Sequence, residues 1–255
     1  MFIPLHDANS LRYIKVQYVT LGLIAANVLV YALTAFGSED HVQAAMIGLG
    51  YIPVTMFEDV VRPDSLVLVP DNATYITYAF LHADIWHLGG NMLFLWVFGD
   101  NVEDALGHVK FLIFYLLCAA AGAWLHGAFA PGSHAPLIGA SGAVAGIVAA
   151  YLMLHPRVKV WILALGRIPI RLPAWIVLAL WVLFQFAMLA AMGEDEVSWA
   201  AHVGGILAGA VLVVFLRRRG VPLFDREIVT PEAVVTAPEP TPAAASEPPS
   251  PWGRR

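Results

Sequence analysis

The stretch GASGAVAGIVAAYLML, at residues 139–154, places a serine hydroxyl at the start of an apolar run rich in glycine and alanine. A second stretch, AHVGGILAG at residues 201–209, places an imidazole in a similar setting. Both contain a Gly-x-x-x-Gly pattern, which lets two membrane helices approach closely. Polar reactive groups are costly inside such segments, so Ser141 and His202 are candidate functional residues. The two stretches therefore predict a pair of tightly packed membrane helices that carry a site.

The composition of the whole chain is that of a membrane protein. Of its 255 residues, 59% are hydrophobic and 13% are charged, and the mean hydropathy is +0.71. Soluble domains carry about 25% charged residues, so a soluble globular domain is a poor fit. The single cysteine, Cys118, lies in an apolar run and is predicted to be a small core residue. Nothing in the sequence indicates a metal, a nucleotide, an organic cofactor or nucleic-acid binding.

Six segments are apolar enough to be membrane crossings, for which about 20 residues are needed. They are residues 17–36, 87–107, 109–130, 141–154, 174–192 and 198–216. The second segment ends in acidic residues and the fourth is short, so we expect neighbouring helices to shield both from lipid. The pattern predicts an all-α, polytopic bundle of six transmembrane helices.

The basic residues are distributed asymmetrically about these six segments. If every segment crosses the membrane, thirteen of the fourteen Lys and Arg residues fall on the side of the N-terminus, and only Arg62 falls on the other. Lys and Arg accumulate in cytoplasmic loops, so both termini are predicted to be cytoplasmic. The thirteen are Arg12, Lys15, Lys110, Arg157, Lys159, Arg167, Arg171, Arg217, Arg218, Arg219, Arg226, Arg254 and Arg255.

Three regions follow from this pattern. Residues 1–16 form a cytoplasmic N-terminal segment, and residues 17–219 form the membrane domain. Residues 220–255 are rich in Pro, Ala and Glu and are predicted to be a disordered cytoplasmic tail. Within the membrane domain, the long first connection, from about residue 37 to 83, is expected to lie partly in the membrane interface. The basic and apolar loop from 155 to 173 is expected to lie along the membrane surface.

The predicted topology brings several polar residues to one depth. The second, fourth and sixth segments run in the same direction, and His87, Ser141 and His202 lie near their starts, with Asn91 one turn deeper than His87. At about 1.5 Å rise per residue, all four fall in the outer third of the bilayer. A serine hydroxyl reaches only a short distance, so contact with His202 requires the close helix approach that the glycine patterns predict.

These residue types are suited to nucleophilic catalysis. Serine becomes a useful nucleophile when a neighbouring base takes its proton, and His202 is a base near neutral pH. A tetrahedral oxyanion needs preorganised donors, and the candidates are the Ser141 backbone N–H, the Asn91 amide and the His87 ring. The outer halves of the fourth and sixth segments contain no carboxylate. We therefore predict a dyad rather than a triad, with His202 held in place by packing.

At this point the sequence resembles a known family. The motifs are His82-x-x-x-x-His87-x-x-x-Asn91, Gly139-x-Ser141-Gly142 and Ala201-His202-x-x-Gly205-x-x-x-Gly209. Together with Gly99-x-x-x-Glu103-x-x-x-Gly107, they resemble the rhomboid intramembrane serine proteases in their six-helix bacterial form. The resemblance covers roughly residues 13–216. It implies a rhomboid-like fold with a long, membrane-associated first loop and no cofactor.

The resemblance also implies roles for individual residues. It implies that Ser141 is the nucleophile, His202 the general base, His87 and Asn91 oxyanion donors, and His82 mainly a structural hydrogen-bonding residue. The motif glycines near the site are structural, namely Gly139, Gly142, Gly205 and Gly209. Transmembrane proteins in the lipid bilayer are the implied substrates. The implied location is a bacterial plasma (inner) membrane, with the active site open to the non-cytoplasmic side. The fifth helix is implied to gate substrate entry, with Trp181 and Phe184 as gate candidates or plain lipid-facing aromatics.

Two positions depart from the family pattern. Some members carry a tyrosine one turn after the serine that stacks on the base, and this chain has Ala145 there, so another group must hold His202. Some members carry a Trp-Arg pair in the first loop, where this chain has Ala73-Thr74.

Two alternatives stay open beside the protease prediction. A non-catalytic rhomboid-like protein would bind membrane helices without cutting them. A metalloprotease would use histidines such as His126 as zinc ligands, although the chain has no His-Glu-x-x-His motif. The sequence specifies neither the natural substrate nor the oligomeric state.

Overall fold

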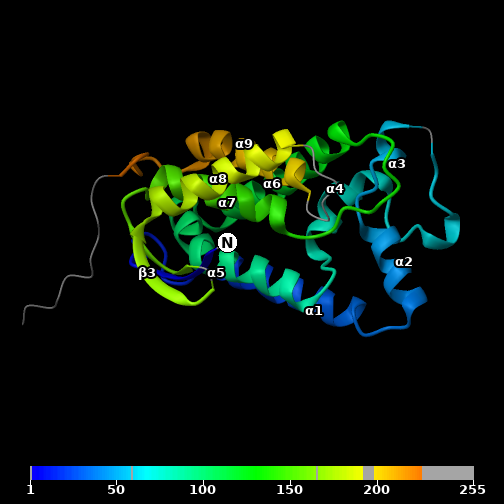
Figure 1. Ribbon diagram of the computed structural model, residues 1–255, viewed down its shortest axis with the longest axis horizontal. Helices are drawn as coiled ribbons and strands as arrows, with labels where there is room; N and C mark the ends of the chain where they lie inside the picture. The colour runs from blue at the N-terminus through cyan, green and yellow to red at the C-terminus, as the bar shows by residue number, and fades with distance from the viewer. Residues whose placement is uncertain (1, 59, 165, 192–197, 226–255) are drawn as a thin grey trace, which may run out of the picture.

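The computed structural model describes residues 2–58, 60–164, 166–191 and 198–225. Helices are found at all six predicted positions, and they run roughly along the long axis of the molecule (Figure 1). They are α1 (Tyr18–Thr34), α5 (Ile85–Leu106), α6 (His108–Phe129), α7 (Ser141–Leu154), α8 (Ala174–Ala191) and α9 (Trp199–Leu216). Most of the predicted disordered tail and the acidic residues 194–196 lie outside the described residues.

Three of these helices, α6, α8 and α9, are long and apolar enough to cross a membrane. The apolar helices α1 and α7 are shorter, with 17 and 14 residues. Helix α5 has 22 residues but carries acidic side chains near its end. The structure therefore supports a helical membrane bundle, and the count of six crossings stays a prediction.

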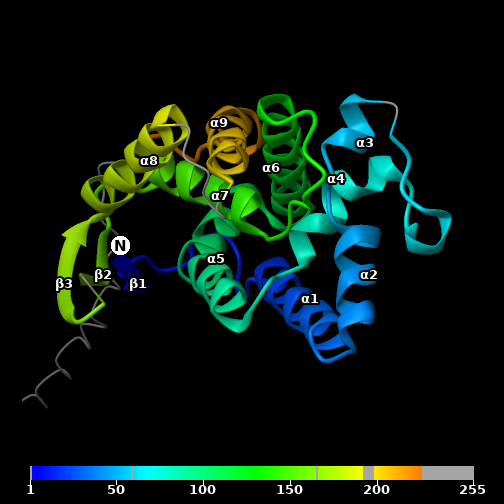
Figure 2. The ribbon, with the colours of Figure 1, turned by 45° about the vertical axis from the view of Figure 1, so that its right-hand side comes forward.

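Helix α7 lies at the centre of the bundle, and this explains why it can be short. It contacts α5, α6, α8 and α9, which surround it in Figure 2. From Gly142 to Tyr151 every residue of α7 is buried. A helix enclosed in this way needs no lipid-facing stripe, and its small side chains let its neighbours come close.

Several short helices fill the connection between α1 and α5, which is not a plain loop. In chain order they are α2 (Glu39–Leu49), α3 (Val54–Phe57), η1 (Asp64–Leu66), η2 (Asp71–Ala73), α4 (Thr74–Thr77) and η3 (Tyr78–Phe80). Arg62 holds this region together: its guanidinium donates to the carbonyls of Ile47, Gly48 and Val69 at 2.7–3.0 Å. It also pairs with Asp71 at 2.6 Å. Arg62, the one basic residue predicted on the non-cytoplasmic side, is thus a buried residue that connects the segments of this region by hydrogen bonds.

A three-stranded antiparallel sheet corrects the prediction of an all-α chain. Its strands are β1 (Phe2–Asp7), β2 (Lys159–Ala164) and β3 (Ile168–Pro173), in the order β1-β2-β3. Residues 159–162 of β2 alternate between exposed and buried, as expected for a strand with one covered face. The sequence alone predicts a surface-lying loop here. A strand could not be recognised from this segment alone, because its partner, β1, lies at the N-terminus, more than 150 residues away in the sequence.

The acidic end of α5 anchors the N-terminal part of the chain. The buried Glu103 carboxylate accepts from the backbone N–H of Val19 and Thr20 at 2.9 and 2.7 Å, and so caps the start of α1. Asp104 accepts from the backbone N–H of three successive residues, Arg12, Tyr13 and Ile14, at 2.7–2.8 Å. These acids therefore fix the chain entering the bundle, which explains why a membrane helix ends in carboxylates.

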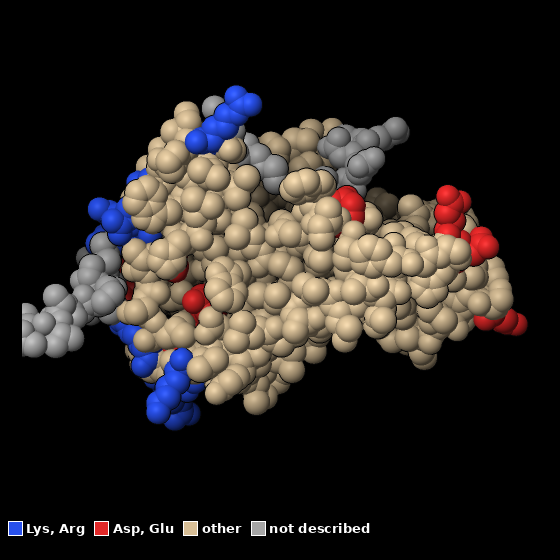
Figure 3. Space-filling model, turned by 90° about the horizontal axis from the view of Figure 1, so that it is seen from below, with Lys and Arg blue, Asp and Glu red and all other residues tan. Residues whose placement is uncertain are grey.

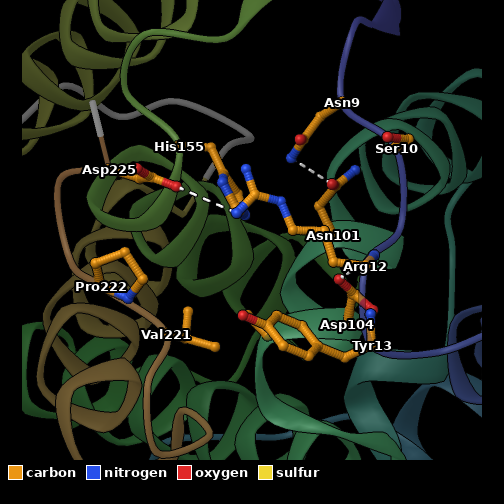
Figure 4. Close-up of a pocket in the computed structure, with 11 residues that line it drawn as sticks. Asn9, Ser10, Arg12, Tyr13, Asn101, Asp104, His155, Val221, Pro222 and Asp225 are labelled. Atoms are coloured by element: carbon orange, nitrogen blue, oxygen red, sulfur yellow. Dashed lines mark hydrogen bonds and ion pairs between the residues drawn. The ribbon is translucent and has the colours of Figure 1, made fainter. Parts of the chain in front are cut away.

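A small pocket of about 20 Å³ lies beside this anchor, between the N-terminal segment, the end of α5 and the chain that follows α9 (Figure 4). In Figure 4 Asn9 points toward Asn101, and Arg12 pairs with Asp225. Asp7, at the end of β1, is buried nearby and accepts a hydrogen bond from the Tyr151 hydroxyl at 2.6 Å. Burial raises the pKa of Asp7 to about 6.

Charged side chains separate along the long axis. Lys and Arg gather at the end that carries the sheet, and most of the Asp and Glu visible on this face lie toward the opposite end, where α2 and α3 are (Figure 3). The ends of α5, α7 and α9 meet the basic end, and their starts face away from it. The charge asymmetry counted along the sequence is therefore also an asymmetry in space.

Candidate active site

Helices α7 and α9 touch through their glycine backbones. A Cβ built on Gly205 would lie 1.8 Å from the carbonyl oxygen of Gly142, and one built on Gly209 would lie 2.3 Å from that of Gly146. Real Cβ atoms do not approach within 3.0 Å, so only glycine fits at either position. The close approach predicted from the two Gly-x-x-x-Gly patterns is observed.

This contact brings together the backbones that flank Ser141 and His202. Ser141 is the first residue of α7, immediately before Gly142, and His202 lies one turn before Gly205 in α9. A Cβ on Gly142 would lie 3.3 Å from the carbonyl oxygen of Ala201, the residue preceding His202. Ser141 and His202 are both partly exposed. Within the described part of the chain no hydrogen bond joins the Ser141 hydroxyl to the His202 ring.

His87 packs against the turn that leads into α7. Gly139 has φ of +114°, a conformation open mainly to glycine, and a Cβ there would lie 2.7 Å from the Cε1 and Nε2 atoms of the His87 ring. Gly139 thus gives the imidazole room two residues before Ser141. The Asp84 side chain caps α5, accepting from the backbone N–H of Trp86 and His87 at 2.7 and 2.9 Å.

Asn91 is buried one turn further along α5. Its amide donates to the carbonyl oxygen of His87 at 3.1 Å. An amide has two N–H donors, so this bond leaves one of them for a ligand.

His82 precedes α5 and packs edge-on against His87, with ring centroids 5.1 Å apart. It is buried, and neither ring nitrogen has a hydrogen-bond partner among the described residues. The hydrogen-bonding role implied for His82 stays a prediction. Burial is the main cause that lowers the pKa of His82 to about 4, so its ring is neutral at pH 7.

The chain before Ser141 is tied to the segment between α1 and α5. Tyr51 and Leu137 exchange two backbone hydrogen bonds at 3.1 and 2.7 Å. The backbone N–H of Gly139 donates to the carbonyl oxygen of Tyr78 at 3.0 Å, and the Tyr78 hydroxyl donates to that of Ala119 in α6 at 2.8 Å. The position of Ser141 therefore depends on segments distant in sequence.

His202 has a polar partner that the sequence analysis missed. Its Nδ1 lies 2.8 Å from Oε1 of Gln185 in α8. Gln185 is 2% exposed, and its amide donates to the carbonyl oxygen of Trp181 at 3.1 Å. A signal was available, because Gln185 is the single polar residue in the eighteen of α8. The partner is an amide rather than a carboxylate, and it lies on a third helix instead of on α7 or α9.

Two indole rings flank His202. Trp181 stacks on it with ring centroids 6.2 Å apart and planes 28° apart, and Trp199 meets it edge-on at 5.9 Å. Ala145, which occupies the position of the tyrosine in some family members, is fully buried. The aromatic support expected from elsewhere thus comes from α8 and α9. Phe184, the second gate candidate, is about half exposed on α8 and contacts Trp199.

Two other residues, His126 and Cys118, have structural surroundings, and for Cys118 this is the core position predicted from the sequence. His126, near the end of α6, has a hydrogen bond between its Nδ1 and the Ser198 hydroxyl at 2.7 Å. Cys118 is fully buried, and its sulfur lies 2.5 Å from the position of a Cβ on Gly146. Neither residue contacts the pair formed by Ser141 and His202, as far as the described residues show.

Comparison with known proteins places this fold in a family. A rhomboid-domain model matches residues 71–219. The yeast (Saccharomyces cerevisiae) rhomboid protein 1, mitochondrial, is 31% identical over 147 residues, covering 56% of this chain and 41% of the relative. The human presenilin-associated rhomboid-like protein, mitochondrial, is 29% identical over 201 residues, covering 78% and 48%. The rhomboid protease GluP of Bacillus subtilis is 29% identical over 150 residues, covering 58% and 27%. The chain thus spans less than half the length of these relatives.

Fold and site define a helical membrane protein whose central short helix is packed through glycines against a second helix. Polar residues gather where the two helices begin. Because the rhomboid-domain model matches more than half of this chain, the chain belongs to the rhomboid family. This family includes proteases such as GluP.

Proposed function

We propose that this protein is an intramembrane serine endopeptidase that cleaves transmembrane proteins. The backbone contact between Gly142 and Gly205 carries the proposal, because these glycines lie one residue after Ser141 and one turn after His202 on separate helices. Membership of the rhomboid family supports the same activity. Ser141 is the nucleophile and His202 the general base.

The first half of the reaction forms an acyl-enzyme. The Ser141 hydroxyl attacks the scissile carbonyl carbon, and His202 Nε2 takes the hydroxyl proton. The oxyanion accepts hydrogen bonds from the Ser141 backbone N–H, which has no partner within α7, and from the free N–H of Asn91 and the ring of His87. His202 then gives its proton to the leaving amine nitrogen as the peptide bond breaks.

The second half of the reaction releases the product. A water molecule attacks the ester carbonyl, His202 takes one proton from it, and the same oxyanion donors stabilise the intermediate. The ester bond breaks, the proton returns to the Ser141 oxygen, and the new carboxyl terminus leaves. The partial exposure of Ser141 and His202 supports access of water to both.

We propose a bacterial plasma membrane as the location, with six crossings and both termini in the cytoplasm. The concentration of Lys and Arg at the sheet end supports this orientation, because cytoplasmic segments collect basic residues. The helix starts that carry the site would then face the non-cytoplasmic side. The Bacillus subtilis relative supports this location, whereas the yeast and human relatives, described as mitochondrial, argue for an organelle.

The decisive experiment uses purified protein in liposomes with a transmembrane substrate and, in parallel, a serine-directed fluorophosphonate. Ser141→Ala and His202→Ala should both fold and lose cleavage, and Ser141→Ala should also lose labelling. His126→Ala is the matched control. It removes a different histidine, in the last turn of α6 beside the start of α9, and leaves His202 in place. Cleavage retained in Ser141→Ala would rule out the nucleophile.

The same preparation separates the protease from a non-catalytic membrane-helix binder. A protein that binds transmembrane segments without cutting or reacting with the fluorophosphonate would favour the binder. A protease with a histidine base should also lose activity on acidification as His202 takes up a proton. An activity that does not fall at any acidic pH at which the protein stays folded would argue against that base.

A further inference from the structure

We propose that Gln185 is a positioning residue that holds His202 in the tautomer and orientation needed to deprotonate Ser141. The inference rests on the proposed function, and it replaces the predicted dyad by three side chains in series. The hydrogen bond between Gln185 Oε1 and His202 Nδ1, 2.8 Å long, is its basis.

The geometry of Gln185 determines which atom faces the histidine. The carbonyl oxygen of Trp181 is only an acceptor, so the side-chain nitrogen of Gln185 must point toward it, at 3.1 Å. The side-chain oxygen of Gln185 then points toward His202, where it can only accept. His202 Nδ1 must therefore carry the proton, and Nε2 is left with its lone pair.

This tautomer is the one that a serine nucleophile requires. A neutral imidazole carries one proton, and a hydrogen bond at one ring nitrogen fixes the role of the other. In Ser-His-Asp enzymes the third residue performs this orienting task from the same ring nitrogen. Here a neutral amide occupies that place. A buried amide at this depth has a lower desolvation cost than an ionised carboxylate.

The aromatic neighbours alone cannot provide this selection. The stack of Trp181 and the edge contact of Trp199 restrain the plane of the imidazole, but neither contact distinguishes Nδ1 from Nε2. Ala145 offers no polar group either. Gln185 reaches His202 from α8. Of the three candidate membrane spans, α8 has the smallest share of buried residues, 22%, compared with 44% for α6 and 50% for α9.

The test compares Gln185→Met, which keeps length but removes the acceptor, with Gln185→Glu, which keeps an acceptor. Asn27→Leu is the matched control: Asn27 is a buried amide of α1 that donates to the carbonyl four residues earlier, as Gln185 does, without touching a histidine. Each variant is assayed for substrate cleavage, for fluorophosphonate labelling against pH, and by ¹⁵N-histidine NMR in detergent micelles.

We expect Gln185→Met to lower kcat about tenfold, as for one neutral hydrogen bond, with KM unchanged. Its His202 spectrum should lose the preference for a proton on Nδ1. Gln185→Glu should restore labelling and move the acid limb of the profile upward, because a carboxylate stabilises the imidazolium. His87, the titratable neighbour of His202 from α5, is common to all variants and leaves this difference intact.

The inference fails if Gln185→Met labels and cleaves like the wild type, or if the wild-type spectrum shows the proton on Nε2. It also fails if Asn27→Leu lowers kcat equally, because any buried amide would then matter. If Gln185→Met does not fold, the wild-type spectrum and Gln185→Glu still decide the question. A wild-type protein that neither cleaves nor labels would instead refute the proposed function.

Discussion

Replacing Gly205 by alanine tests the helix contact on which the site depends. The new Cβ would lie 1.8 Å from the carbonyl oxygen of Gly142, so the two backbones must separate by about 1.2 Å to reach even 3.0 Å. The three atoms nearest to this Cβ are all backbone atoms of Gly142 in α7, so no side chain can rotate away to make room. The helix itself must therefore move.

The expected effects on stability and activity differ in size. Overpacking of this kind costs about 1–3 kcal/mol, which a folded bundle can survive. A misplacement of about 1 Å between reacting groups can cost roughly 10²-fold in rate. Gly205→Ala should therefore fold with a lowered Tm and lose about 99% of its cleavage activity. Fluorophosphonate labelling of Ser141 should slow in parallel, since it depends on the same base.

Gly22→Ala is the matched control, because nothing lies within 4 Å of a Cβ at that position in α1. Removing this helix glycine should stabilise the protein by about 0.5–1 kcal/mol and leave activity unchanged. If Gly205→Ala cleaves at the wild-type rate with an unchanged Tm, α7 and α9 are not in backbone contact, and the geometric basis of the proposed pair is wrong.

Three further predictions concern the surroundings of the site and the opposite end of the molecule. Asn91→Ala should lower kcat by about 10²–10³ if its free N–H serves the oxyanion; full activity in steady-state cleavage assays would remove Asn91 from that role. Asp84→Ala should lower the Tm by uncapping α5, whereas Asp84→Asn should retain the cap. The backbone N–H groups of His87 and Trp86 lower the pKa of Asp84, so the stability contributed by its carboxylate is present at neutral pH and is lost as the pH falls through that lowered pKa. Equal Tm values for the wild type, Asp84→Ala and Asp84→Asn at pH 7 would contradict the capping role. Asp7→Asn should stabilise the fold at pH 7 by up to about 3 kcal/mol, because the pKa of Asp7 rises from 3.8 to about 6 on folding. That raised pKa favours the fold below pH 4 and loses this effect as the pH rises through 6, so denaturant titrations of variant and wild type should diverge between pH 4 and 7; parallel curves would show that Asp7 is not buried as an acid.

The helices of the bundle were predictable because their physical cause is local. Apolar runs about the length of a bilayer crossing, with turns rich in Gly and Pro between them, indicate helix positions regardless of the partners. The glycines at positions 142 and 205 are likewise read directly from spacing, and the predicted close approach is observed. The buried position of Cys118 was predictable for the same reason, because it lies within an apolar run.

The sheet could not be predicted in the same way. The β2 pattern in residues 159–164 is consistent with either a surface loop or a strand until a partner is known. That partner, β1, is contributed by the first residues of the chain. Pairing across such a sequence separation is decided by the folded bundle, which brings the N-terminus to the end of α7 and the start of α8.

The hydrogen bond between Gln185 and His202 could not be predicted from the sequence pattern either. Gln185 stands out as polar in α8, but nothing along the chain says which neighbour its amide meets. The direction of that amide depends on the Trp181 carbonyl, and its reach to His202 depends on how α8 lies against α9. The absence of carboxylates from the outer halves of the fourth and sixth segments therefore predicted a dyad, because an amide on α8 gives no such signal in the sequence.

The sequence by itself determined the membrane class, the family, the helix positions and the residues of the proposed reaction, because hydropathy, small-residue spacing and motif order are properties of the chain. Only the tertiary structure decided the sheet, the hydrogen bonds of the buried Arg62 and the contact between Gln185 and His202. These depend on the direction of individual side chains across helices distant in sequence, and hydrogen bonds acquire their partners only when the bundle has closed.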